Sequence, residues 1–167
     1  MVPYPGRARA GAGVAFTVAI AVVLDLWSKA AAADRLSDGT ARALLPGLDL
    51  RLALNRGISF SLFPAHGPVS LAVLLACQGA LTGLVAWLAF RATRRIERLG
   101  LALISGGALG NVLDRWMDGS VTDFLDLHPA GVHWFTFNLA DAWITLGVVL
   151  LVHDAIRTPH RTYGGHV

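Results

Sequence analysis

Two aspartates, Asp123 and Asp141, are the residues of this chain whose type and placement best suit a chemical step. Asp123 follows an apolar run that ends near Trp116, and Asp141 stands at the start of the next apolar run. Two carboxylates held close together cannot both ionise easily, so they share one proton. One can then act as a general base toward water and the other as a general acid toward a carbonyl oxygen. The pair therefore indicates amide hydrolysis if the fold brings the two acids together.

The spacing alone leaves other assignments open. Asp114 and Asp126 are further acids in the same region, so several pairs can be drawn, and each acid could equally be solvated or bound to Arg115. His128 and His133 with a nearby aspartate are a candidate three-ligand metal site, although they lack the HExxH spacing that fixes two ligands on one helix face. A serine nucleophile is disfavoured because no GxSxG context surrounds Ser59, Ser61, Ser105 or Ser120.

Composition indicates a membrane protein. Hydrophobic residues make up 54% of the 167-residue chain and charged residues 15%, against about 25% charged residues in soluble domains. The length suits one domain with about four spans of about 20 residues. The net charge is +3, but the basic residues collect at ends of apolar runs, which favours a membrane topology signal over nucleic-acid binding. The single Cys77 excludes an intramolecular disulfide and a cysteine-based metal site.

Four apolar runs predict transmembrane helices, with flexible tails at residues 1–13 and 157–167; the runs are residues 14–33, 69–90, 99–116 and 138–156. A cleavable signal peptide is the competing interpretation of the first run, and the charged residues near its end argue against it. With four spans the basic residues fall on one side, namely Arg7, Arg9, Arg91, Arg94, Arg95, Arg98, Arg157 and Arg161. Both termini are therefore expected in the cytoplasm and both acid-bearing loops outside.

Polar residues at the ends of spans are functional candidates, because charge is costly within a membrane. Asp25 and Lys29 stand at i and i+4 near the end of the first span, which indicates either a structural ion pair or a polar support beside a site. Asn111, Asp114 and Arg115 fall on one face of the third span. We expect that face to look into the helix bundle rather than at lipid.

The first outer loop carries a strand signal. Leucine recurs at every second position between Leu48 and Asn55, the period of a strand with one apolar face. A turn follows at Asn55-Arg56-Gly57, and a second apolar piece runs from Ile58 to Phe63. A small sheet lying on the membrane surface is therefore expected, with Asn55 serving either the turn or a site.

Five blocks, in order, closely resemble the lipoprotein signal peptidase (signal peptidase II) family of bacterial membranes. The resemblance covers about residues 14–155. The blocks are Asp25-Leu-Trp-Ser-Lys29, Asn55-Arg-Gly57, Gly106-Gly-Ala-Leu-Gly-Asn-Val-Leu-Asp-Arg115, Val121-Thr-Asp-Phe124 and Phe137-Asn-Leu-Ala-Asp141. Two small departures occur: Ile58-Ser59 stands where many members have Ala-Ala, and Thr122 where many have Val.

The resemblance implies a single membrane-embedded peptidase domain, all-α with four transmembrane helices and a small extracytoplasmic β-sheet that cradles the substrate. It implies an aspartic endopeptidase of the bacterial inner membrane that cuts prolipoproteins just before a diacylglyceryl-modified cysteine. Asp123 and Asp141 would be catalytic. The expected partners are the prolipoproteins and membrane lipids, with no metal, cofactor or nucleic acid, and the expected state is a monomer. The residues implied to line or support the site are Asn55, Gly57, Gly107, Asn111, Asp114, Arg115, Asn138, Asp25 and Lys29.

Two other functions fit some of these features. A small transporter or proton-conducting protein would also place acids and amides within a membrane, but its path needs polar groups along the bilayer depth. Here they collect at one surface. The other is a catalytically inactive relative that binds lipopeptide, and the presence of both Asp123 and Asp141 argues against it.

Overall fold

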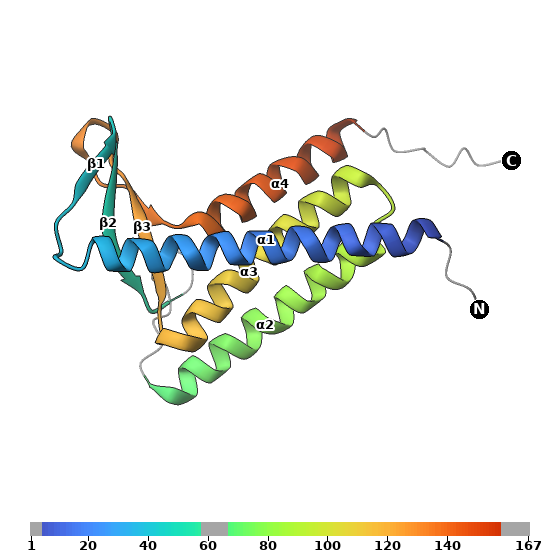
Figure 1. Ribbon diagram of the computed structural model, residues 1–167, viewed down its shortest axis with the longest axis horizontal. Coiled ribbons are helices and arrows are strands. Elements are labelled where there is room, and N and C mark those ends of the chain that lie inside the picture. Colours follow the sequence, from blue (N-terminus) through green and yellow to red (C-terminus); the bar gives the residue numbers. More distant parts are fainter. Residues whose placement is uncertain (1–4, 58–66, 158–167) are drawn as a thin grey trace, which may run out of the picture.

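The computed structural model describes residues 5–57 and 67–157, and side chains from residue 9 onward within them. Within these residues, four helices are long and apolar enough to cross a membrane. They are α1 (Pro5–Arg35), α2 (Pro68–Arg91), α3 (Arg95–Asp118) and α4 (Leu139–Arg157). The helices form a bundle with a sheet at one end, while α1 begins and α4 ends at the other (Figure 1).

Helix α3 is the centre of the bundle, because it packs against α1, α2 and α4. Glycines permit these close approaches: a Cβ at Gly106 would lie 2.6 Å from the Cβ of Ala21 on α1. The helix ends at Gly119, whose left-handed φ of 71° lets its N–H donate to the carbonyl of Arg115. The chain then turns directly into the sheet.

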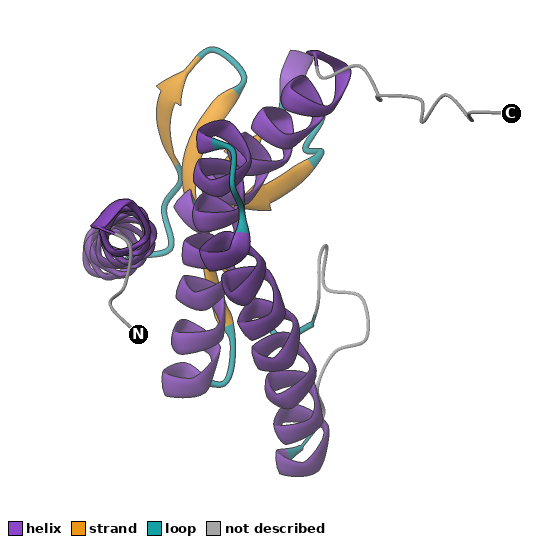
Figure 2. Cartoon of the chain, turned by 90° about the vertical axis from the view of Figure 1, so that its right-hand side faces the viewer, coloured by secondary structure: helices purple, strands orange, loops and turns teal. Residues whose placement is uncertain are grey.

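The sheet has four antiparallel strands in the order β1-β2-β3-β4, and it lies at the end of the bundle where α1 and α3 finish and α4 starts (Figures 1 and 2). The strands are β1 (Arg42–Leu45), β2 (Leu48–Asn55), β3 (Val121–Leu127) and β4 (Phe135–Phe137). In the register of β2 and β3, Ala53 lies opposite Asp123. Phe124 packs on Ala32 and Leu36, which fixes the sheet against the end of α1.

The predicted strand at Leu48–Asn55 is confirmed as β2. The second apolar piece, Ile58 to Phe63, lies outside the described residues. Strand β2 pairs with β1 and with β3, and β3 and β4 both lie in the connection between α3 and α4. Strand β3 is mostly buried on both faces, and its buried positions include polar residues. The apolar-to-polar alternation that marks a half-exposed strand is therefore absent from its sequence.

Two predicted boundaries are wrong. Residues 5–13, expected as part of a flexible lead, are helical, because α1 starts at Pro5 and proline is tolerated in a first helical turn. Helix α3 starts at Arg95 rather than Leu99, because arginine and glutamate are good helix formers that extend the helix beyond its apolar part. The last span differs little, ending at Arg157, and residues 158–167 lie outside the described part.

Candidate active site

The polar residues gather in one cluster where the bundle meets the sheet. Helix α1 contributes Asp25 and Lys29, and β2 with the residues after it contributes Asn55 and Gly57. The end of α3, strand β3 and the start of α4 supply the rest: Asn111, Asp114, Arg115, Asp123, Asn138 and Asp141. The cluster thus joins segments that lie far apart in the sequence.

Asn138 links the two aspartates. Its Nδ2 donates to Oδ1 of Asp123 at 2.6 Å. It is also the residue before α4: the Asp141 N–H donates to Oδ1 of Asn138 at 3.0 Å, and the Asn138 N–H donates to Oδ2 of Asp141 at 3.2 Å. This reciprocal pair satisfies two N–H groups at the helix start, as in a capping box. One fully buried amide therefore fixes Asp141 at the helix end and holds Asp123 beside it.

Asn111 is a second amide bridge. Its Nδ2 donates to Oδ1 of Asp141 at 3.0 Å. Its Oδ1 accepts from the Lys29 ammonium at 2.7 Å and from Nδ2 of Asn138 at 3.2 Å. Since an ammonium can only donate, Lys29 fixes the orientation of the amide and so aims its N–H toward Asp141.

Asp123 has a second donor from the neighbouring strand. Nδ2 of Asn55 donates to Oδ2 of Asp123 at 3.3 Å, while Oδ1 of Asn55 accepts from the Gly57 N–H at 3.0 Å. Asn55 therefore bonds both within the turn and to Asp123. Burial and, to a lesser extent, the nearby charge of Asp141 together raise the pKa of the Asp123 carboxyl to about 6.

A buried ionic group lies next to Asp123 and Asp141 and positions both. The Lys29 ammonium lies 2.8 Å from Oδ2 of Asp25 and 3.3 Å from Oδ2 of Asp114, and all three side chains are at most 5% exposed. Asp25 accepts from the N–H of Ala140 at 2.8 Å, and Asp114 accepts from the N–H of Thr122 at 2.7 Å. Each acid thus holds the backbone next to one of the two aspartates, so the group positions both.

Arg115 ties the end of β2 to the helices. Its guanidinium donates to Oε1 of Gln78 on α2 at 2.9 Å, to the carbonyl of Asn55 at 3.3 Å and to the carbonyl of Gly57. At Thr122, where many members of the family have Val, the bond to Asp114 comes from the backbone N–H, so it does not depend on the side chain. Sequence reasoning missed Gln78, whose only signal is that it is a lone amide within an otherwise apolar span.

Gly107 lies where α3 packs closely against Ala140, the residue before Asp141. A Cβ there would collide with the carbonyl of Ala140 and approach Cγ1 of Ile144 to 2.9 Å, so Gly107 lets α3 reach the first turn of α4. Gly110 leaves room for the ionic group: a Cβ there would lie 2.5 Å from Oδ2 of Asp25.

Asp126 belongs to a different group. It stands three residues after Asp123 on β3, which places the two on opposite faces of the strand. It is buried at 2% exposure, with His133 Nδ1 at 2.7 Å and Arg51 at 3.6 Å, so it is not a solvated loop acid. His128 pairs separately with Asp49 at 3.0 Å. Within residues 5–57 and 67–157, no three metal-binding side chains converge, so the two candidate histidines serve different acids.

Comparisons with known proteins agree on one family. The family model described as signal peptidase (SPase) II matches residues 17–157. A lipoprotein signal peptidase of Paraburkholderia phymatum is 42% identical over 142 residues, which are 84% of this chain and 86% of the relative. One of Burkholderia mallei is 40% identical over 139 residues, covering 83% of this chain and 84% of the relative.

The fold is also found among solved structures. A bacterial membrane enzyme determined by the in meso method at 2.3 Å resolution superposes with a TM-score of 0.78, covering 93% of this chain and 94% of its own, at 20% identity. A second, determined at 1.9 Å, gives a TM-score of 0.74 at 22% identity, with 87% and 94% coverage. These two structures therefore share with this chain the arrangement of the helices and the sheet.

Proposed function

The chain belongs to the signal peptidase II family, and on that premise we propose that Asp123 and Asp141 activate a water molecule for cleavage of prolipoproteins. Membership of the family implies the general activity, which is removal of signal peptides from prolipoproteins by a multi-pass membrane protease. The proposal adds an aspartic mechanism and a cut just before the diacylglyceryl-modified cysteine. The observation that carries it is the pair of amides, Asn138 and Asn111, which hold the two carboxylates in one hydrogen-bonded group.

The surroundings of the two acids differ enough to suggest separate roles. Asp123 has its pKa raised to about 6 by burial and by the charge of Asp141, so it holds the shared proton. Asp141 accepts from the Asn111 amide and an N–H at the start of α4, where the helix dipole stabilises negative charge. Asp141 is therefore the general base that takes a proton from water, and Asp123 is the general acid that donates one to the scissile carbonyl oxygen.

The remaining assignments follow from where the cluster lies. We place the cluster at the extracytoplasmic face. The helix ends far from the sheet carry the arginines Arg91, Arg95, Arg98 and Arg157, which mark the cytoplasmic side. A substrate anchored in lipid by its diacylglyceryl group reaches such a site by diffusing within the bilayer. The protein is proposed to need no metal and no cofactor, and to act as a monomer.

Mass spectrometry of a model prolipoprotein incubated with the purified protein tests this function. We expect one cut, immediately before the modified cysteine, in the diacylglyceryl-modified precursor and none in the unmodified precursor. The rate should be unchanged by strong chelators, because carboxylates activate water directly. Cleavage elsewhere would contradict the proposed position, and loss of activity on chelation with recovery on added zinc would transfer the chemistry to a metal.

The raised pKa of Asp123 predicts the pH dependence. An acid whose pKa is raised to about 6 keeps its proton below that pH and loses it above, so kcat/KM should fall as pH rises through about 6. Asn55 stabilises the ionised form of Asp123 by donating to it, so Asn55→Ala should move this decline to higher pH. Movement to lower pH, or a profile flat between pH 5 and 8, would remove Asp123 from the role of acid.

Cysteine labelling tests the orientation. In a Cys77→Ser background, which removes an exposed thiol, Ala41→Cys and Val132→Cys should react with a membrane-impermeant reagent outside intact cells. Thr93→Cys, in the connection between α2 and α3, should react only after the cells are opened. Outside labelling of Thr93→Cys would reverse the topology.

A further inference from the structure

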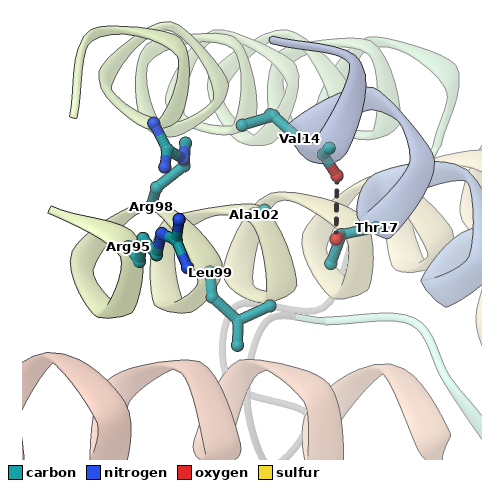
Figure 3. A pocket seen from close by; sticks show the side chains of 7 residues that line it. Val14, Thr17, Arg95, Arg98, Leu99 and Ala102 are labelled. Carbon is teal, nitrogen blue, oxygen red and sulfur yellow. Dashed lines mark hydrogen bonds between the residues drawn. The ribbon is translucent and has the colours of Figure 1, made fainter. Parts of the chain in front are cut away.

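An open hollow of about 170 Å³ lies between α1 and α3, at the end of the bundle opposite the aspartates. Figure 3 shows Arg95, Arg98 and Leu99 reaching it from α3 and Val14 and Thr17 from α1. None of these residues touches the acid cluster. The Thr17 hydroxyl donates to the carbonyl of Gly13 at 2.9 Å, so its polar group is already satisfied.

The two arginines of this hollow differ from their neighbour. Arg94 is held by acids, with Glu97 at 3.6 Å and Asp154 at 3.0 Å. Within the described part of the chain, no ion pair of this kind joins Arg95 or Arg98 to an acid. They are three positions apart on one helix, so they lie on the same face. The hollow therefore presents two positive charges without a counter-charge.

Its floor is apolar. Val14 and Ala102 are almost fully buried and belong to one hydrophobic cluster, while Leu99 is 44% exposed at the open side. Two guanidinium groups beside an exposed aliphatic wall match a ligand with an anionic head and a hydrocarbon tail. Guanidinium binds phosphate through paired N–H donors, and basic residues near a membrane surface attract anionic lipids.

We propose that this hollow is a binding site for an anionic phospholipid, with its phosphate on Arg95 and Arg98 and an acyl chain along Leu99. The lipid lies in the leaflet opposite the acid pair and contacts both α1 and α3. A free phosphate ion satisfies only the arginines and leaves the apolar wall uncovered, which is why a lipid is the occupant. The proposal is independent of the cleavage chemistry.

Native mass spectrometry of the purified protein with added phosphatidylglycerol or phosphatidylcholine tests it. We expect phosphatidylglycerol to bind more tightly and to raise the melting temperature, and inorganic phosphate at millimolar concentration not to displace it. In Arg95→Gln/Arg98→Gln, affinity for phosphatidylglycerol should fall about 30-fold, since each basic residue near an anionic surface contributes roughly a fivefold factor. Binding of phosphatidylcholine, whose choline cation offsets the phosphate charge, should fall much less.

Two further variants separate the site from overall charge. Arg91→Gln/Arg157→Gln removes the same charge from the same end of the bundle but outside the hollow, so its affinity should stay within about twofold of the parent. Gly13→Leu keeps both arginines and fills the hollow, because a Cβ at Gly13 meets nothing within 4 Å, and it should weaken binding too. Equal loss in the two double variants, full binding by Arg95→Gln/Arg98→Gln, or displacement by inorganic phosphate would overturn the proposal.

Discussion

Replacing either Asp123 or Asp141 by asparagine is expected to abolish detectable cleavage while leaving the fold intact. Asparagine keeps the size of aspartate and can still accept a hydrogen bond, but it can neither take a proton from water nor donate one to the carbonyl oxygen. General acid–base catalysis alone contributes roughly 10²–10⁴-fold, and loss of the activated water adds to this. The measurement is the cleavage rate of a diacylglyceryl-modified prolipoprotein by each purified variant, with binding of the lipopeptide measured separately.

The double variant sharpens this expectation. When two groups act as one unit in catalysis, removing either one already abolishes nearly all activity. Asp123→Asn/Asp141→Asn should therefore be little worse than either single variant. Rate losses that multiply would instead indicate two independent contributions. Near-normal cleavage by Asp141→Asn would show that another acid is the partner of Asp123.

Asp126 offers a control matched in burial. Asp123 and Asp126 are 3% and 2% exposed and lie on the same strand, but Asp126 faces His133 and Arg51 instead of the second aspartate. Asp126→Asn should therefore cleave at a near-normal rate even if it loses some thermal stability. An inactive Asp126→Asn beside an active Asp123→Asn would mean that the proposed pair is wrong.

The sequence predicted the four spans and one strand because their signals are local. Apolar runs of membrane length predict helices, and the alternation of leucines from Leu48 predicts β2. It could not predict β3, whose polar residues at buried positions conceal the two-residue period. The joining of β2 to β3 is a long-range contact, so no local pattern reports it, although it carries Asp123 to Asn55.

The candidate site was predictable in its residue types but not in how they hold one another. Asp25 and Lys29 were expected as a pair from their spacing, and the structure bears this out. The use of Asp25 to hold the N–H of Ala140, and of Asp114 to hold that of Thr122, joins side chains to backbone groups, which have no sequence signature. Polar networks of this kind are specified by the whole fold, so they are read only from coordinates.

These contacts explain why ionic residues are retained inside the bundle. An apolar replacement at Asp25, Lys29 and Asp114 would pack the helices, but it would leave the first turn of α4 and the start of β3 without acceptors for their N–H groups. Unsatisfied buried N–H groups are costly, and the two aspartates follow these N–H groups directly in the chain. By binding these two N–H groups, the ionic group fixes the positions of the two aspartates relative to each other.

Lys29→Met should consequently lower both stability and activity. The substitution keeps most of the side-chain length but leaves Asp25 and Asp114 buried at 0% and 5% exposure without their shared ammonium. Removing one partner from a buried ionic group costs about 3–5 kcal/mol, because the remaining charge is uncompensated. Activity should fall as well, since the ammonium orients Asn111 toward Asp141. Thermal unfolding in detergent and the cleavage rate measure the two effects.

A second acid–base pair with the same spacing provides the control. Asp38 and Arg42 also stand at i and i+4 with the acid first, but both side chains are about half exposed, so Arg42→Gln should leave the melting temperature unchanged. A similar decrease in both variants would mean that burial does not distinguish the pairs. If Lys29→Met kept its stability and lost only activity, Lys29 would act on the acid pair through Asn111 and would not be needed to hold the helices. That result would move Lys29 from the support of the site to the hydrogen-bonded group that contains Asp123 and Asp141.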